Sequence, residues 1–156
     1  MTRTTMPLRD QSARDAIASD FGTTYVVEAA AGTGKTSALV GRIVGLIAGG
    51  TTELERVVSV TFTEKAAGEM KLRMRSKIEE ERKASSGKRR ERLDRALLQL
   101  ETARIGTIHS LCADILRERP IEADIDPVFR VSPEPESYER FRRVFDAWYL
   151  HTLRSP

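Results

Sequence analysis

The segment Glu28-Ala29-Ala30-Ala31-Gly32-Thr33-Gly34-Lys35-Thr36 decides how this chain folds. It follows the apolar run Tyr25-Val26-Val27 and precedes residues 39–47, whose apolar positions recur at helical spacing. The order of strand, glycine-rich loop and helix is that of a phosphate-binding P-loop. Gly32 and Gly34 permit backbone conformations that a Cβ disfavours, so successive N–H groups can turn toward a phosphate. The sequence therefore predicts a nucleoside triphosphate site in an α/β fold.

The side chains that follow the loop complete the predicted site. The Lys35 ammonium can reach the outer phosphates, and the Thr36 hydroxyl can ligate Mg²⁺. The start of the helix adds unpaired N–H groups and the positive end of the helix dipole. We therefore expect ATP and Mg²⁺ as cofactors, with Lys35 and Thr36 as catalytic residues and Thr36 as the metal ligand. Ala29 stands where the general pattern has glycine. The alternative is a glycine-rich turn that binds nothing.

Two later segments indicate which class of P-loop enzyme the chain resembles. Residues 57–60 predict a short buried strand, and Thr61-Phe62-Thr63-Glu64-Lys65-Ala66-Ala67-Gly68-Glu69-Met70 follows directly. Further along comes Gly106-Thr107-Ile108-His109-Ser110. In order, spacing and composition these motifs, with Gln11 upstream of the loop, resemble those of the UvrD/RecB-type DNA helicases over residues 7–118. Alanine at position 29 is itself the pattern of that family.

The resemblance assigns roles to particular residues. It implies that a glutamine hydrogen-bonds adenine while the loop binds the phosphates, which gives the nucleotide-binding set Gln11, Ala29, Ala30, Ala31, Gly32, Thr33, Gly34, Lys35 and Thr36. It implies a second set on single-stranded DNA: Phe62, Thr63, Lys65, Thr107 and His109. Glu64, where many UvrD-like members carry asparagine, leans toward the RecB-like branch. The implied activity is 3′ to 5′ movement along single-stranded DNA driven by ATP hydrolysis, in repair or recombination.

The DNA-side residues also make physical sense without the family. Thr63 and Thr107 each lie between a predicted strand and a predicted helix, so each can cap its helix while its N–H faces a phosphate. Phe62 offers an aromatic face for a splayed base. The alternative for Phe62 is core packing, because aromatic side chains at strand ends are usually buried. The alternative for His109 is a structural histidine bonded to neighbouring backbone.

Along the chain, predicted strands and helices alternate, which is typical of a parallel sheet flanked by helices. The pattern predicts helices over residues 10–19, from 35 to Gly49-Gly50, from 64 onward, around 93–100 and over 108–116. The helix from 64 has an inner stripe of Ala66, Met70, Met74 and Ile78. Strands are predicted over 24–27, 57–60 and 104–106, and a loop over 84–87. We expect residues 1–120 to form the first, incomplete part of a P-loop NTPase (RecA-like) ATP-binding domain. Residues 121–156 then begin a helical insertion subdomain, where Tyr138, Phe141, Phe145 and Trp148 recur on one face that needs a partner surface.

Composition places the chain among globular proteins outside the membrane. Of 156 residues, 40% are hydrophobic and 31% charged, and the net charge of +3 permits nucleic-acid binding. The single cysteine, Cys112, cannot form an internal disulfide and suits a reducing cytoplasm. The basic residues of 71–92 alternate with glutamates, which favours a solvated, ion-paired face over DNA contact. We expect no signal peptide and no membrane partner.

One expected element of a hydrolase is missing. A P-loop enzyme needs a second acidic site, typically an apolar strand that ends in aspartate, to hold Mg²⁺ and orient water. No such segment follows the P-loop here, so we expect an N-terminal piece of a longer helicase that binds ATP without hydrolysing it. Its expected partners are single-stranded DNA, the rest of the helicase chain, and nuclease or recombination subunits. The alternatives are another P-loop ATPase or kinase, or a nucleotide- or DNA-binding module without turnover.

Overall fold

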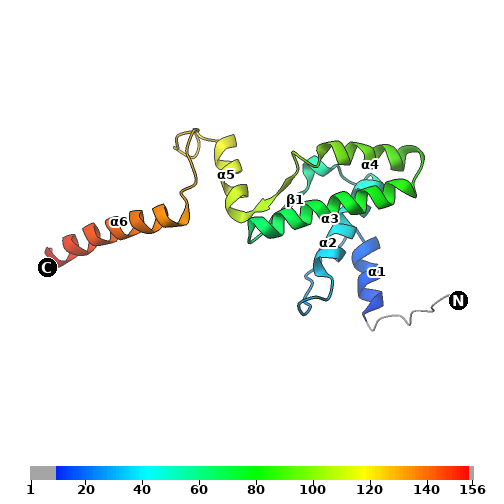
Figure 1. The fold of residues 1–156 in the computed structure, drawn as a ribbon, viewed down its shortest axis with the longest axis horizontal. Helices are drawn as coiled ribbons and strands as arrows, with labels where there is room; N and C mark the ends of the chain where they lie inside the picture. The colour runs from blue at the N-terminus through cyan, green and yellow to red at the C-terminus, as the bar shows by residue number, and fades with distance from the viewer. Residues whose placement is uncertain (1–9, 155–156) are drawn as a thin grey trace. The chain divides into compact units, whose positions relative to one another are not determined.

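The computed structural model describes residues 10–154 and shows an α/β arrangement. In chain order its elements are α1 (Gln11–Ser19), α2 (Lys35–Gly49), the short 3-10 helix η1 (Leu54–Arg56), β1 (Val58–Thr61), α3 (Glu64–Lys83), α4 (Gly87–Gln99), β2 (Arg104–Thr107), α5 (Ile108–Glu118) and α6 (Glu134–Arg154) (Figure 1). The chain divides into two compact units between Leu111 and Cys112. Each unit is described by itself.

The first unit contains a parallel sheet of two strands. β1 and β2 pair in the register Val58↔Arg104 through Thr61↔Thr107, with α3 and α4 forming the crossover between them. Both strands lie within one residue of their predicted positions. Because the strands are parallel, their carboxyl ends meet at one edge, and α3 and α5 both begin there. This edge brings together the two sequence segments that are predicted to contact DNA.

The core of the first unit lies between α2, α3 and α4, which pack against one another. Its largest fully buried side chains are Val44, Leu54, Met74, Ile78, Leu93 and Leu100. The predicted inner stripe of α3 is confirmed at Met70, Met74 and Ile78 but is wrong at Ala66, which is exposed, while Ala67 is buried. Repeated steps of four residues drift by about 40° each around a helix of 3.6 residues per turn. A step of three residues, from Ala67 to Met70, keeps Ala67 on the same buried face as Met70, Met74 and Ile78.

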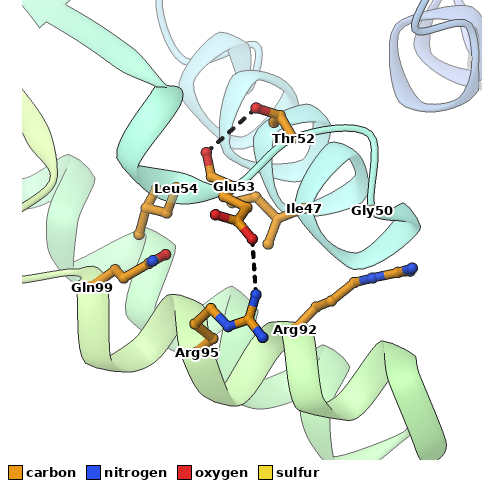
Figure 2. A pocket seen from close by; sticks show the side chains of 8 residues that line it. All are labelled: Ile47, Gly50, Thr52, Glu53, Leu54, Arg92, Arg95 and Gln99. Carbon is orange, nitrogen blue, oxygen red and sulfur yellow. Dashed lines mark hydrogen bonds and ion pairs between the residues drawn. The ribbon is translucent and has the colours of Figure 1, made fainter.

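Helix α2 ends where the sequence predicts, at Gly49-Gly50. Gly50 has φ 80°, and the N–H of Thr51 donates to the carbonyl of Leu46 at 3.0 Å. A Cβ at Gly50 would lie 2.3 Å from Cζ of Arg92 on α4, a flexible side chain that can move, so the requirement for glycine here is its backbone conformation. Figure 2 shows this end of α2, where Arg95 and Glu53 form an ion pair of 2.8 Å across a cavity of about 90 Å³. A cavity of that size holds a few water molecules, not a nucleotide.

The strand predicted over residues 24–27 is not formed. The segment carries no strand pairing, and the Val26 side chain is 97% exposed. A strand exists only with a neighbour that completes its hydrogen-bond ladder. Within residues 10–154, β1 and β2 pair only with each other, so this segment has no such neighbour.

The second unit contains most of α5 and all of α6. The predicted aromatic face of α6 is present, and neighbouring rings contact each other: the centroids of Phe141 and Phe145 lie 5.9 Å apart, and those of Phe145 and Trp148 lie 5.7 Å apart. No residue of α6 is buried. Within the part of the chain that the structure covers, no helix has the length and apolar character needed to cross a membrane.

Candidate functional site

The loop before α2 contains two glycines in a left-handed backbone conformation. Gly32 and Gly34 have φ values of 77° and 90°, in the left-handed region that glycine adopts without strain. A Cβ added at Gly32 would meet nothing within 4 Å, so its requirement is conformational and not steric. The Thr33 hydroxyl donates to the Ala30 carbonyl at 2.7 Å and tightens the turn.

The N-terminus of α2 opens directly onto this loop. Gly34 caps the helix and offers no side chain to its N–H groups. The N–H of Ala38 donates to the Gly34 carbonyl at 2.9 Å, and the N–H groups before it have no acceptor within the helix. A helix of 15 residues adds a positive partial charge at this point. Backbone donors and the dipole therefore favour an anion here.

Lys35 folds back over the loop. Its Nζ donates to the carbonyls of Ala29 at 2.5 Å and Ala30 at 2.7 Å, and the residue is exposed. Thr36 is half-buried in the same first turn of α2. Both residues border a hollow of about 400 Å³, whose lining is Ile17, Tyr25, Val27, Lys35, Thr36, Ala38, Leu39 and Arg42. The Lys35 ammonium thus bonds back to the start of the predicted loop, at Ala29 and Ala30.

Helix α1 is tied to the loop by a residue that sequence reasoning missed. Arg14 donates to the Thr33 carbonyl at 3.2 Å and forms an ion pair of 2.8 Å with Asp10. Its hydrogen bond holds the pKa of Asp10 below the ordinary value. Gln11, the predicted adenine reader, lies one turn earlier on α1 and donates through Nε2 to Asp15 at 2.8 Å. The signal that the sequence offered for Arg14 was its position three residues after Gln11, on the same face of the predicted helix.

Arg42 is a second missed residue, and it fastens the segment before the P-loop to α2. Its guanidinium donates to the carbonyls of Ile17 at 2.8 Å, Asp20 at 2.7 Å and Thr23 at 2.9 Å. It also lies over two rings, 5.4 Å from the centroid of Phe21 and 5.0 Å from that of Tyr25. The sequence signal was a lone charge within the apolar stretch 38–48.

The edge formed by the strand ends carries the other predicted residues. Thr63 accepts from the N–H of Ala66 at 3.1 Å, and Thr107 accepts from the N–H of Ser110 at 3.2 Å. Both capping predictions are confirmed. The two segments also touch, because the Thr107 hydroxyl donates to Oε1 of Glu64 at 3.1 Å.

Three side chains project from this edge. Phe62 is 94% exposed, so the core-packing alternative is wrong for this structure. Lys65, in the first turn of α3, and His109, in the first turn of α5, are also exposed. Within residues 10–154 the His109 ring has no hydrogen bond to backbone, so the structural alternative for this histidine lacks its expected contact. The edge presents an aromatic ring, a cation and an imidazole beside two capped helix starts.

Within residues 10–154, four of the ten basic residues in 71–92 form ion pairs, namely Arg75, Lys77, Arg82 and Arg89, so the predicted ion-paired face is formed only in part. Lys77 lies 3.1 Å from Glu80, Arg89 lies 2.8 Å from Glu81, and Arg75 lies 2.6 Å from Glu101. In the described part of the chain, no group of three or more His, Cys, Asp or Glu side chains is placed to hold a metal ion.

Comparison with known proteins places these features in a family. The model of the UvrD/REP helicase N-terminal domain matches residues 9–154. Similar relatives include two proteins whose names describe an ATP-dependent helicase/nuclease subunit, from Alkaliphilus oremlandii (40% identical over 116 residues, 74% of this chain and 10% of the relative) and Alkaliphilus metalliredigens (39% over 132 residues, 82% and 11%). A third helicase/nuclease subunit, from Latilactobacillus sakei, is 35% identical over 136 residues, 83% of this chain and 15% of that relative. The chain therefore spans about a tenth of the length of the first relatives. The chain belongs to the UvrD/REP helicase N-terminal domain family.

Proposed function

We propose that this chain forms the first part of the RecA-like ATP-binding domain of a DNA helicase. The complete enzyme would couple ATP hydrolysis to 3′ to 5′ movement on single-stranded DNA, in repair or recombination. One observation carries this proposal: a single compact unit holds both a triphosphate-type loop and an exposed strand edge suited to DNA. Family membership supports it.

The loop residues fit the triphosphate of ATP. Residues 29–36 supply two left-handed glycines and the start of a helix, with its N–H groups that have no acceptor within the helix and the positive end of its dipole. We propose that Lys35 exchanges the carbonyls of Ala29 and Ala30 for phosphate oxygens, because an anion is a stronger partner for an ammonium than a carbonyl. Thr36 would hold Mg²⁺, which neutralises phosphate charge when bound. Gln11 would leave Asp15 to pair with the adenine edge.

The strand edge fits a single strand of DNA. Phe62 would stack on a base, and Lys65 would pair with a phosphate. The starts of α3 and α5, capped by Thr63 and Thr107, would offer N–H groups to the backbone of the strand. His109, in the first turn of α5, would lie along the same path. Each of these contacts is independent of sequence, as translocation along DNA requires.

Turnover would need more than these residues. We propose that this polypeptide binds ATP with Mg²⁺ but does not hydrolyse it, because it lacks an apolar strand ending in an acid. The acid and the second half of the ATP site would come from the rest of a helicase chain. We propose nuclease or recombination subunits as further partners; the relatives are named as subunits of an ATP-dependent helicase/nuclease. A cytoplasmic location fits the free thiol of Cys112.

DNA binding by the strand edge can be tested on the purified chain. We expect a fluorescein-labelled oligothymidylate to gain anisotropy with wild type, and Phe62→Ala to weaken binding at least about fivefold, since one base stack contributes roughly 1 to 3 kcal/mol. Leu98→Ala, which removes another highly exposed apolar side chain (83% exposed), from α4, is the matched control. Equal affinities for wild type and Phe62→Ala, or no binding by wild type, would contradict the proposal.

A further inference from the structure

Glu64 connects the two segments of the strand edge. It lies in the first turn of α3, directly after the capping residue Thr63. Its Oε1 accepts from the Thr107 hydroxyl at 3.1 Å, across the edge from β1 to β2. Thr107 is itself buried, with 7% of its surface exposed. An exposed carboxylate on one segment thus reaches the buried cap of the other.

The bond to Glu64 decides how Thr107 can act. A hydroxyl has one hydrogen and two lone pairs, and a carboxylate can only accept. With the hydrogen directed to Glu64, the lone pairs of Oγ1 face the Ser110 N–H at 3.2 Å. The Ser110 hydroxyl in turn donates to the Thr107 carbonyl at 2.8 Å. Without an acceptor at position 64, the Thr107 hydrogen can turn to Ser110 Oγ, which lies 3.3 Å away.

We propose that Glu64 is a positioning residue for DNA binding: its carboxylate holds the starts of α3 and α5 in one fixed spacing, through Thr107. This inference rests on the proposed binding of single-stranded DNA by the strand edge. Glu64 makes no contact with DNA in this account. It fixes the distance between two groups of backbone donors that a single phosphate chain must meet together.

Charge alone predicts the opposite effect of removing Glu64. A carboxylate beside the path of the phosphates repels them, so its loss should tighten binding. Positioning predicts that loss of the acceptor weakens binding. The sign of the change therefore separates the two effects, and Glu64→Gln separates them again because its amide oxygen still accepts a hydrogen bond while the charge is gone.

The test measures oligothymidylate affinity by anisotropy for a set of variants of the full chain. We expect Glu64→Ala to bind about three- to tenfold more weakly than wild type, the range that one hydrogen bond supports. We expect Glu64→Gln to bind as tightly as wild type or more tightly. Glu69→Ala removes a matched charge from the exposed face of α3 and should not weaken binding. In a Thr107→Val background, Glu64→Ala should cause no further weakening, because only the charge effect is left.

A second readout does not depend on DNA. Hydrogen exchange of the Ser110 amide, followed by NMR, should accelerate in Glu64→Ala and stay near wild type in Glu64→Gln. If Glu64→Ala does not fold, Glu64→Asp keeps the charge but shortens the reach, and should weaken DNA binding and accelerate the same amide.

Wild type that binds no oligothymidylate overturns the proposed function and the DNA role of Glu64 together. Wild type that binds, with equal affinities for Glu64→Ala and Glu64→Gln, overturns the inference alone. Unchanged Ser110 exchange in Glu64→Ala also overturns the inference alone.

Discussion

Replacing Arg42 by alanine should detach α1 from the first unit. No residue of α1 is fully buried, so the attachment of this helix depends on its contacts with α2. Arg42 supplies three bonds to carbonyls, at 2.7 to 2.9 Å, and two ring contacts. These acceptors lie in and just after α1, in the segment that leads to the P-loop.

The size of the effect follows from these contacts. Hydrogen bonds to a charged group contribute about 1.5 to 3 kcal/mol each, and exposed cation–π contacts about 0.5 to 1 kcal/mol. Two of the three carbonyl contacts are exposed, so water replaces much of what the guanidinium provides. We therefore expect Arg42→Ala to lower the free energy of unfolding by about 2 to 3 kcal/mol, well beyond the roughly 0.5 kcal/mol of ordinary surface changes.

Urea unfolding followed by circular dichroism measures this loss, and hydrogen exchange locates it. Amides of α1 should lose more protection than those of α3 and α4, whose loss should not exceed the change in global stability. Arg42→Lys retains a charge but lacks the fork of donors, and should lose an intermediate amount. Arg90→Ala, at an exposed position on α4, is the control and should lose less than about 0.5 kcal/mol. An Arg42→Ala variant as stable as that control, with α1 still protected, would refute the reasoning.

Three further predictions follow from single contacts. Thr63→Ala should destabilise the chain by about 1 kcal/mol in urea unfolding while Thr63→Ser does not, because the hydroxyl accepts from Ala66; equal losses for both would contradict the cap. The Arg89 hydrogen bond holds the pKa of Glu81 below its ordinary 4.5, so this stabilisation is present above pH 4.5 and lost as pH falls through the lowered value; Glu81→Gln should flatten that acid limb of stability, and an unchanged limb would count against it. Gln11→Ala should weaken binding of ATP more than of GTP, since guanine reverses the donor and acceptor pattern of adenine, and equal weakening would remove Gln11 as the adenine reader.

Local features were predictable from the sequence because their causes are local. Thr63 and Thr107 cap helices through N–H groups three residues away, and Gly50 ends α2 by its own backbone conformation. The strands at 58–61 and 104–107 pair with each other, so their apolar pattern was sufficient. The prediction of a strand at 24–27 was wrong because a strand needs a neighbouring strand, and a pattern of apolar residues does not show whether a neighbour is there.

The missed parts of the site depend on long-range contacts. Arg14 and Arg42 bond to backbone carbonyls 19 to 25 residues away, and a carbonyl has no side-chain signature in a sequence. The link from Glu64 to Thr107 spans 43 residues and exists only because β1 and β2 are parallel neighbours. The apolar pattern could not predict the exposure of Phe62 either, because an aromatic residue after a strand is buried or exposed according to what packs over it.

Nucleotide titration of the purified chain tests the central claim most directly, with binding and turnover measured on one preparation. Isothermal calorimetry with ATP and Mg²⁺ should show binding by wild type and none by Lys35→Ala, because Lys35 is the cation at the centre of loop 29–36. Phosphate release should stay at background for both, with and without oligothymidylate. Binding that survives Lys35→Ala, or no binding by folded wild type, would contradict the assignment of this loop as the ATP site. DNA-stimulated phosphate release that Lys35→Ala abolishes would show instead that the chain is a complete ATPase.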